Sequence, residues 1–160
     1  MTDVPPTDLI ALAALHESSC NDFDESERHL YGEAALSIVD LRRLNQQTRW
    51  FSLFLYDEKT TKLVAYCVCN VRKSRVYVFR LVVLPPYRGH GIGKYVHDYI
   101  ISPGHHYVAN IPERWLAGQI WLRRQGWRAA EIDTGHFPDG ENAIVFYRNL
   151  RNVVDDETTK

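Results

Sequence analysis

The sequence predicts one mixed α/β domain. Three observations lead to this class. Strand-like runs follow one another closely in the middle of the chain. A glycine-rich turn then joins the last of these runs to an amphipathic stretch, and two further strand-like runs near the C-terminus suit an antiparallel pair. At 160 residues, 45% of them hydrophobic, the chain is expected to bury a single core, with about 1–6 and 152–160 flexible.

The first part of the chain is expected to form two helices. Thr7 can cap a helix that carries Leu9, Leu12, Ala13 and His16 on one side. Apolar residues recur at helical spacing over 24–44, which predicts a second helix. Gly32 falls inside that stretch and weakens its first turns.

The rest of the chain alternates between strand and helix signals. Runs that are rich in valine and aromatic residues and alternate between apolar and polar predict strands. Apolar residues that recur every three or four positions predict helices. Ser102-Pro103-Gly104 should end the first of these helices, and Pro112 and Gly126 should begin and end the second. The expected strands are 49–57, 62–72, 74–84, 105–111, 127–135 and 142–150, and the expected helices are 92–100 and 112–126.

Composition excludes several classes of function. The net charge of −1 gives no field that would attract nucleic acid or acidic lipid, so neither is an expected partner. No apolar run is long enough to span a bilayer, and the N-terminus lacks a signal-peptide pattern. The odd number of cysteines, Cys20, Cys67 and Cys69, suggests reduced thiols in a cytoplasmic protein. No further ligands stand at metal-finger spacing, so no metal is expected.

The glycine turn is the strongest functional signal. In LPPYRGHGIGKYV, residues 84–96, glycine stands at every second position of the turn. A strand, a bare turn and a helix start together form an anion cradle, because free N–H groups and the helix dipole favour negative charge there. The spacing fits neither the triphosphate loop, which needs four residues between its glycines, nor G-x-G-x-x-G, which would need glycine at Lys94. The alternative interpretation is a purely structural turn.

Residues 88–93, Arg-Gly-His-Gly-Ile-Gly, match the pattern [Arg/Gln]-x-x-Gly-x-[Gly/Ala]. This segment resembles the acetyl-CoA loop of the GCN5-related N-acetyltransferase (GNAT) superfamily, and the resemblance runs from about Arg49 to Leu150. It implies the GNAT fold, an α+β arrangement with a mixed, mostly antiparallel central sheet that is splayed at the cofactor strand and flanked by helices. It also implies acetyl-CoA as cosubstrate. It also implies that Leu81, Val82 and Val83 line the pantetheine arm and that Arg88, Gly89, His90, Gly91, Ile92, Gly93 and Lys94 wrap the diphosphate.

Within the superfamily, the chain is most similar to the branch that acetylates protein N-termini, including the ribosomal-protein alanine acetyltransferases. The resemblance lies in VYVFRLVVLPPYRGHGIG, in VANIPERWLAGQIWLRRQGW and in GHFPDGENAIVFY. It implies an amine acceptor, with His136 and Phe137 covering the terminus of the substrate. It also places Tyr77 at the position of a strand tyrosine that helps to deprotonate the amine.

Three positions depart from the branch. Asn110 stands where a Glu or His usually assists the tyrosine, and Trp115 replaces an Asn that contacts the cofactor. Leu122 replaces a Tyr that protonates the departing thiolate. The candidate catalytic residues are therefore Tyr77 and Asn110, and the alternative for Tyr77 is an ordinary strand aromatic.

The chemistry of the acceptor bears on these departures. An α-amine has a pKa near 8, so roughly a tenth of it is neutral at pH 7, whereas a lysine amine is neutral at about one part in two thousand. A weak base therefore suits an N-terminal substrate better than a lysine. Three hypotheses stay open: acetylation of a peptide or protein N-terminus, acetylation of a small amine, and an acyl-CoA-binding module without turnover. The protein is expected to be a monomer or a homodimer.

Overall fold

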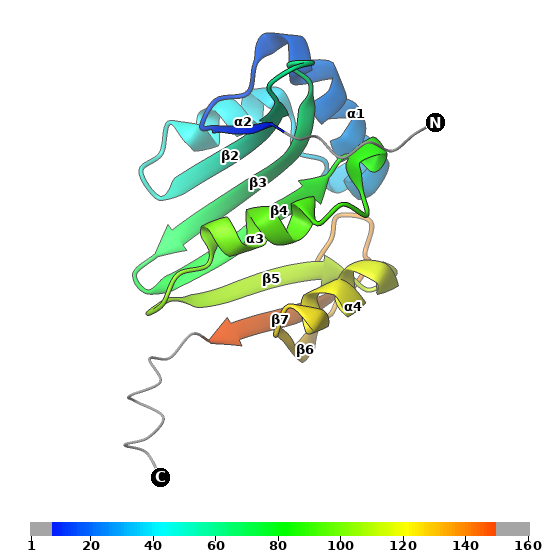
Figure 1. The fold of residues 1–160 in the computed structure, drawn as a ribbon. Coiled ribbons are helices and arrows are strands. Elements are labelled where there is room, and N and C mark those ends of the chain that lie inside the picture. Colours follow the sequence, from blue (N-terminus) through cyan, green and yellow to red (C-terminus); the bar gives the residue numbers. More distant parts are fainter. Residues whose placement is uncertain (1–7, 150–160) are drawn as a thin grey trace.

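The computed structural model describes residues 8–149 and is built on one seven-stranded sheet with the order β1-β2-β3-β4-β5-β7-β6 (Figure 1). The strands are β1 (Leu9–Leu12), β2 (Trp50–Asp57), β3 (Leu63–Arg72), β4 (Arg75–Val83), β5 (His106–Pro112), β6 (Arg128–Asp133) and β7 (Ala143–Asn149). The α-helices are α1 (Cys20–Tyr31), α2 (Ile38–Asn45), α3 (Ile92–Ile100) and α4 (Leu116–Arg124), and short 3-10 turns are η1 (Glu17–Ser19), η2 (Gly32–Ala34) and η3 (Pro85–Tyr87).

All neighbouring strands pair antiparallel except β4 and β5, which are parallel and are connected through α3. Strand β7 lies between β5 and β6, so the expected antiparallel pair at the end of the chain is confirmed. The fold is therefore the predicted α+β arrangement, with a mixed and mostly antiparallel sheet.

Helices cover the sheet on two sides (Figure 1). The core on one side joins α3 and α4 to the sheet through residues such as Val96, Leu122 and Phe146. The core on the other side joins α1 and α2 to the sheet through Phe23 and Leu41. These two layers matter for function because the candidate site passes between them.

The first expected helix is wrong. Leu9–Leu12 forms β1, which pairs antiparallel with β2 from Leu9 opposite Asp57 to Leu12 opposite Phe54. Leu9 and Ala11 pack on the core while Ile10 and Leu12 face outward, a period of two rather than of a helix. The partner strand lies more than forty residues away in the sequence, so local periodicity could not reveal this pairing. Thr7 lies outside the described residues.

The second expected helix is two helices. Helix α1 ends at Tyr31 because Gly32 adopts φ +54°, and η2 separates it from α2. Ser37 then caps α2, its Oγ accepting a hydrogen bond from the N–H of Asp40 at 3.0 Å. The break turns the end of α1 toward the gap between β4 and β5, where it forms part of the candidate site.

The last expected helix begins later than predicted. Pro112 is the final residue of β5, opposite Ala143, and α4 starts at Leu116. The other predicted strands and the helix over 92–100 are confirmed, with small shifts at their ends. Among residues 8–149, no helix combines the length and the apolar character that crossing a membrane would take.

Candidate active site

A gap in the sheet forms the candidate site. Strands β4 and β5 pair only from Arg75 opposite His106 to Tyr77 opposite Val108, and beyond this point they separate. Phe79 is an extra residue in β4, because Val78 pairs with Cys69 and Arg80 with Val68. A cavity of about 760 Å³ occupies the gap, a volume typical of small-molecule sites. Its wall comes from both layers, α3 and α4 on one side and the end of α1 on the other.

The glycine turn lies at the α3 end of this cavity. Gly89 and Gly91 have φ values of +82° and +77°, which favour glycine, and the space in front of both is open. Among the described residues, none of the backbone N–H groups of 89–94 donates to another protein group. Gly91 is also the N-cap of α3 and supplies no capping side chain. A run of free amides at a helix start, with open space before it, fits the diphosphate of a coenzyme.

Gly93 serves a different purpose from the other two glycines. A β-carbon there would lie 3.3 Å from a ring carbon of Trp121 and 3.6 Å from a methyl of Val83. The third glycine therefore lets α3 pack closely against α4 and the end of β4. The sequence pattern is one motif, but it has two physical causes.

The charged side chains of the turn are held by the protein itself. Arg88 Nε donates to the carbonyl of Val83 at 2.9 Å, which fixes the turn to the end of β4. Lys94 forms an ion pair with Asp98, one helical turn further on. His90 does not line the cavity, and its Nε2 is buried without a partner among the described residues. The amides, Arg88 and Lys94 are thus the groups of the turn that face the cavity.

The predicted pantetheine residues all line the cavity, but they face different layers. Leu81 and Val83 pack with the α3 and α4 core, whereas Val82 belongs to the α1 and α2 core. Ile92 also lines the cavity and is only 4% exposed, so it can offer a ligand little beyond its backbone.

A buried histidine of α3, His97, joins this helix to the elements beneath it. His97 accepts a hydrogen bond at Nε2 from the indole N–H of Trp127 at 2.9 Å, and its Nδ1 lies 2.9 Å from a carboxylate oxygen of Asp98. This arrangement fits a neutral imidazole that donates from Nδ1. Burial lowers the pKa of His97, and the cation of Arg148 nearby adds to this effect. The helix that carries the free amides is therefore anchored through an uncharged side chain to Trp127, just before β6, and lies against Arg148 of β7.

The far end of the cavity, toward α1, is built from side chains. Its wall includes Tyr31, Phe79, Asn110, Arg114 and Trp115. The rings of Tyr31 and Trp115 lie 4.9 Å apart and join the end of α1 to the start of α4. Burial raises the pKa of Tyr31 to about 12, so its phenol stays protonated at neutral pH.

A buried ion pair holds this end in place. Arg80 Nε lies 2.9 Å from Glu27 Oε1, and both side chains are almost completely buried. Tyr66 donates to the other carboxylate oxygen of Glu27 at 2.6 Å, and the guanidinium of Arg80 covers the ring of Tyr31 at 3.5 Å. The pair thereby fixes α1, and with it Tyr31, against β3 and β4.

The two predicted catalytic residues fall on the same face of the sheet. Tyr77 pairs with Val108, and Asn110 follows two positions later on β5, so both side chains lie on the side away from α3 and α4. Asn110 lines the cavity, but Tyr77 does not. The hydroxyl of Tyr77 is 3.5 Å from Nη1 of Arg75, at the start of β4. Tyr77 therefore lies at the rim of the gap, where β4 and β5 last pair.

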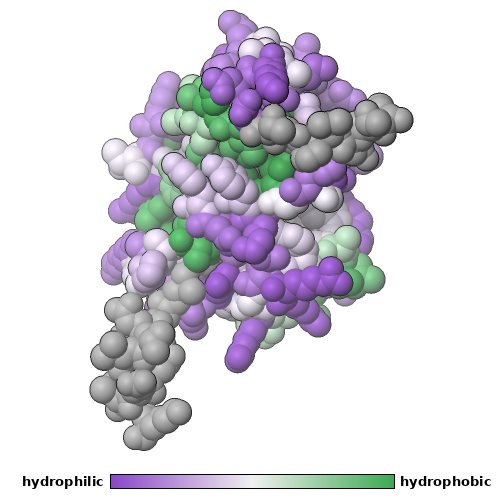
Figure 2. Space-filling view, viewed as in Figure 1, coloured by the Kyte–Doolittle hydropathy of each residue, from purple (hydrophilic) through white to green (hydrophobic). Residues whose placement is uncertain are grey.

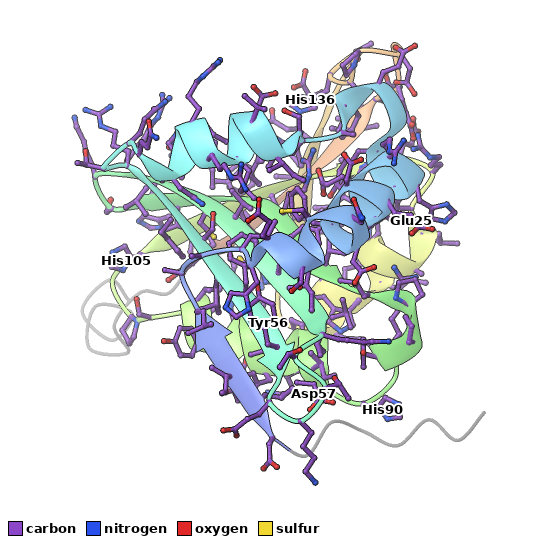
Figure 3. All side chains as sticks on the ribbon, turned by 90° about the horizontal axis from the view of Figure 1, so that it is seen from above. Glu25, Tyr56, Asp57, His90, His105 and His136 are labelled. Atoms are coloured by element: carbon purple, nitrogen blue, oxygen red, sulfur yellow. The ribbon has the colours of Figure 1, made fainter. Side chains whose placement is uncertain are left out.

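The predicted substrate residues lie away from the turn. His136 and Phe137 belong to the loop between β6 and β7 and do not line the cavity. His136 Nδ1 lies 2.8 Å from Oδ2 of Asp133. The rings of His136 and Phe137 pack edge to face. Figure 3 shows His90 and His136, the two histidines at motif positions, on opposite sides of the molecule.

Sequence reasoning missed most of the α1 end of the cavity. Tyr31, Phe79 and Arg114 were not candidates, because each reaches the cavity through a tertiary feature: a helix end, a β-bulge and a turn. The interrupting Gly32 was the available signal for Tyr31. Leu122, at the position where a thiolate donor is expected, is 5% exposed and packs in the core, so it offers no proton.

The model of the acetyltransferase (GNAT) family matches residues 12–148 of this chain. No curated protein has a sequence that matches the chain.

Solved structures agree on the fold. The Escherichia coli ribosomal-protein-S18-alanine N-acetyltransferase superposes with a TM-score of 0.73 at 18% identity, over 91% of this chain and 96% of its own. Arabidopsis thaliana Naa50, solved with the bisubstrate analogue CoA-Ac-MVNAL, gives 0.69 at 12% identity over 88% and 98%. Arabidopsis thaliana NAA60, solved with acetyl-CoA, gives 0.70 at 11% identity over 88% and 98%. At such identities the likeness establishes the fold alone.

Proposed function

The chain belongs to the acetyltransferase (GNAT) family, and we propose that this acetyl-CoA-dependent enzyme transfers the acetyl group to the α-amine of a peptide or protein N-terminus. The observation that carries the proposal is the cavity through the gap between β4 and β5. Such a passage lets a donor and an acceptor meet from opposite layers of the sheet.

The α3 end suits the donor. The amides of 89–94 would hold the diphosphate, with the charge of Arg88 and Lys94 beside it, and the separated edge of β4 over 78–83 would pair with the pantetheine arm. When bound, acetyl-CoA supplies a thioester carbon that a neutral amine can attack. Free backbone N–H groups on the edge of β4 can stabilise the oxyanion that this attack creates.

The α1 end suits an amine that needs little help to lose its proton. Asn110 offers a neutral amide, and Tyr77 at the rim offers a phenol hydroxyl. A water held between them can pass the proton of an α-amine to solvent, and roughly a tenth of that amine is already neutral. A lysine would need a stronger base. The departing thiolate can take up a proton from solvent, because a thiol has a pKa near 8.5.

A small amine is the second candidate acceptor. The observation that favours it is the aromatic pair Tyr31 and Trp115, which narrows the α1 end of the cavity. The third hypothesis, a module that binds acyl-CoA without turnover, follows from Leu122 and Asn110, which place no strong acid or base in the cavity.

The test is thiol release from acetyl-CoA with a panel of acceptors. Short peptides with small first residues are prepared with free and with blocked N-termini, each containing an internal lysine. We expect product only from the free termini, with a rate that rises with pH until the α-amine is neutral. Product from blocked peptides would show that lysine is reached, and product from small amines alone would support the second candidate. Tight acetyl-CoA binding without any product would support the third.

A further inference from the structure

Arg114 lies in the wall of the cavity, between β5 and α4, and contacts two elements that are otherwise separate. Its Nη2 donates to the carbonyl of Leu30, at the end of α1, at 3.3 Å. Its Nη1 forms an ion pair with Glu141, in the loop between β6 and β7, and lies 3.9 Å from Asp139. Figures 1 and 3 both show this loop rising toward the helices on the α1 side of the sheet. Arg114 therefore spans the space between α1 and the loop.

The two contacts of Arg114 differ in strength. On the loop side, the backbone N–H of Arg114 also donates to Glu141 at 3.1 Å, and Glu113 exchanges hydrogen bonds with Asn142 at 3.0 and 3.1 Å. Glu141 is 17% exposed, so its ion pair is partly shielded from solvent. On the α1 side there is one long hydrogen bond to Leu30 and the ring contact between Tyr31 and Trp115. The α1 side is thus the side that separates first.

Helix α1 ends beside Arg114, and the buried side chains of Arg80 and Glu27 hold the sheet side of this end. Gly32 follows Tyr31 directly with φ +54°, and η2 replaces a regular continuation of the helix. The two residues that Arg114 and Trp115 contact, Leu30 and Tyr31, are the last two before this glycine. The side chain of Arg114 can therefore leave Leu30 and keep its ion pair with Glu141, while Arg80 and Glu27 still hold the chain after Gly32.

We propose that Arg114 is a specificity-determining residue for the acceptor, acting through a clasp formed by Leu30, Tyr31, Arg114 and Trp115. The proposal rests on the proposed function. An amine that reaches Asn110 from the α1 side carries the rest of its molecule out between α1 and the β6–β7 loop, where the clasp lies. A short acceptor fits inside the closed clasp. A longer polypeptide must open it first and therefore binds less well.

The test compares two acceptors on one enzyme. Ala-Gly amide and an eight-residue peptide that begins Ala-Gly are acetylated separately at the same saturating acetyl-CoA concentration, so that any effect on the donor cancels in their ratio. Arg114→Met keeps the length of the side chain and removes its donors. We expect kcat/KM for the long peptide relative to the short one to rise about tenfold, the size of a single lost contact, mainly through KM. Glu141→Gln, which weakens the anchor of Arg114, should move the ratio in the same direction.

Arg124→Met on α4 is the matched control, since no ion pair of Arg124 is found among the described residues, and it should leave the ratio unchanged. A second measurement needs no turnover. Hydrogen exchange at the amides of 31–36 should quicken in Arg114→Met and stay the same in Arg124→Met. An unchanged ratio, or unchanged exchange, would overturn the clasp. If neither peptide is acetylated by the native enzyme or by any variant while exchange does quicken, the proposed function fails and the contact of Arg114 with α1 stands. In that case its role in specificity fails too.

Discussion

The two ends of the cavity are made from different parts of the polypeptide. At the α3 end the groups that face the cavity are largely backbone amides, exposed because Gly89 and Gly91 carry no side chain. At the α1 end they are large side chains, Tyr31, Phe79 and Trp115, held by a buried ion pair. Backbone amides can bind any ligand that carries a diphosphate, because every sequence has them. A wall made of side chains can bind a different ligand in each relative, because the side chains can change. The difference suggests why the donor of this enzyme is easier to infer than its acceptor.

The surface around α4 shows the same contrast. Figure 2 shows an apolar area at the end of α4 nearest β5's C-terminus, where Leu116 and Ile120 are 65% and 43% exposed. Leu116 follows Trp115 directly and Ile120 lies about one helical turn later, so the start of α4 is apolar on its exposed surface as well as beside the cavity. The glycine turn over 89–91, by contrast, consists of Gly, His and Gly and so carries no aliphatic side chain.

The largest expected effect tests the backbone end. Gly91→Glu places a side chain and a negative charge where the diphosphate would lie, and it also strains a residue with φ +77°. We expect acetyl-CoA affinity to fall by at least about 100-fold, measured by calorimetry, because several charge-assisted hydrogen bonds are lost together. Gly104→Glu is the control. Gly104 has φ +88° and open space before it, but it follows α3 and does not line the cavity, so affinity should be retained. Native affinity in Gly91→Glu would contradict the assignment of the turn.

The next effect tests the side-chain end. Tyr77→Phe removes one hydroxyl at the rim of the gap and keeps the ring. We expect kcat to fall by about 10² to 10⁴, the range for a general base, while acetyl-CoA affinity stays the same. Tyr99→Phe, on the exposed surface of α3, should keep full activity. A fully active Tyr77→Phe enzyme would move the role to Asn110, Glu113 or His136, and would make Tyr77 an ordinary strand aromatic.

The smallest effect concerns His97, which anchors the helix behind the backbone end of the cavity, and is a change in how stability depends on pH. His97 is neutral when folded, and its pKa is lowered chiefly by burial. The unfolded chain, with an ordinary pKa of about 6.5, binds this proton at higher pH than the folded chain does. The free energy of unfolding should therefore be unaffected by His97 above about pH 6.5 and should fall as the pH drops from there to its folded pKa.

Urea unfolding at several pH values measures this dependence. His97→Gln should flatten the slope of stability against pH below about pH 6.5, whereas His29→Gln, on the exposed face of α1, should not. An identical slope in native protein and His97→Gln would mean that other groups cause the acid sensitivity. The readout is a slope, so it stays valid even if His97→Gln is less stable at every pH.

The sequence by itself determined the glycine turn at the α3 end of the cavity, most of the sheet and the fold class. The glycine turn, the helix over 92–100 and the strands from Trp50 to Val83 could be predicted because each depends on residues close together in the chain. A positive φ, a helix start and a strand's alternation are local properties. The sequence also indicated the family, through the spacing of residues 88–93.

Only the tertiary structure decided the α1 end of the cavity. Leu9–Leu12 became a strand because β2 was available to pair with it, and the helix expected over 24–44 divided so that Tyr31 could meet Trp115. Arg114 contacts Leu30 and Glu141, which are 84 and 27 residues away in the sequence. Pairings of this kind depend on where the chain returns in space, because side chains from distant elements can form one wall only after the sheet has assembled.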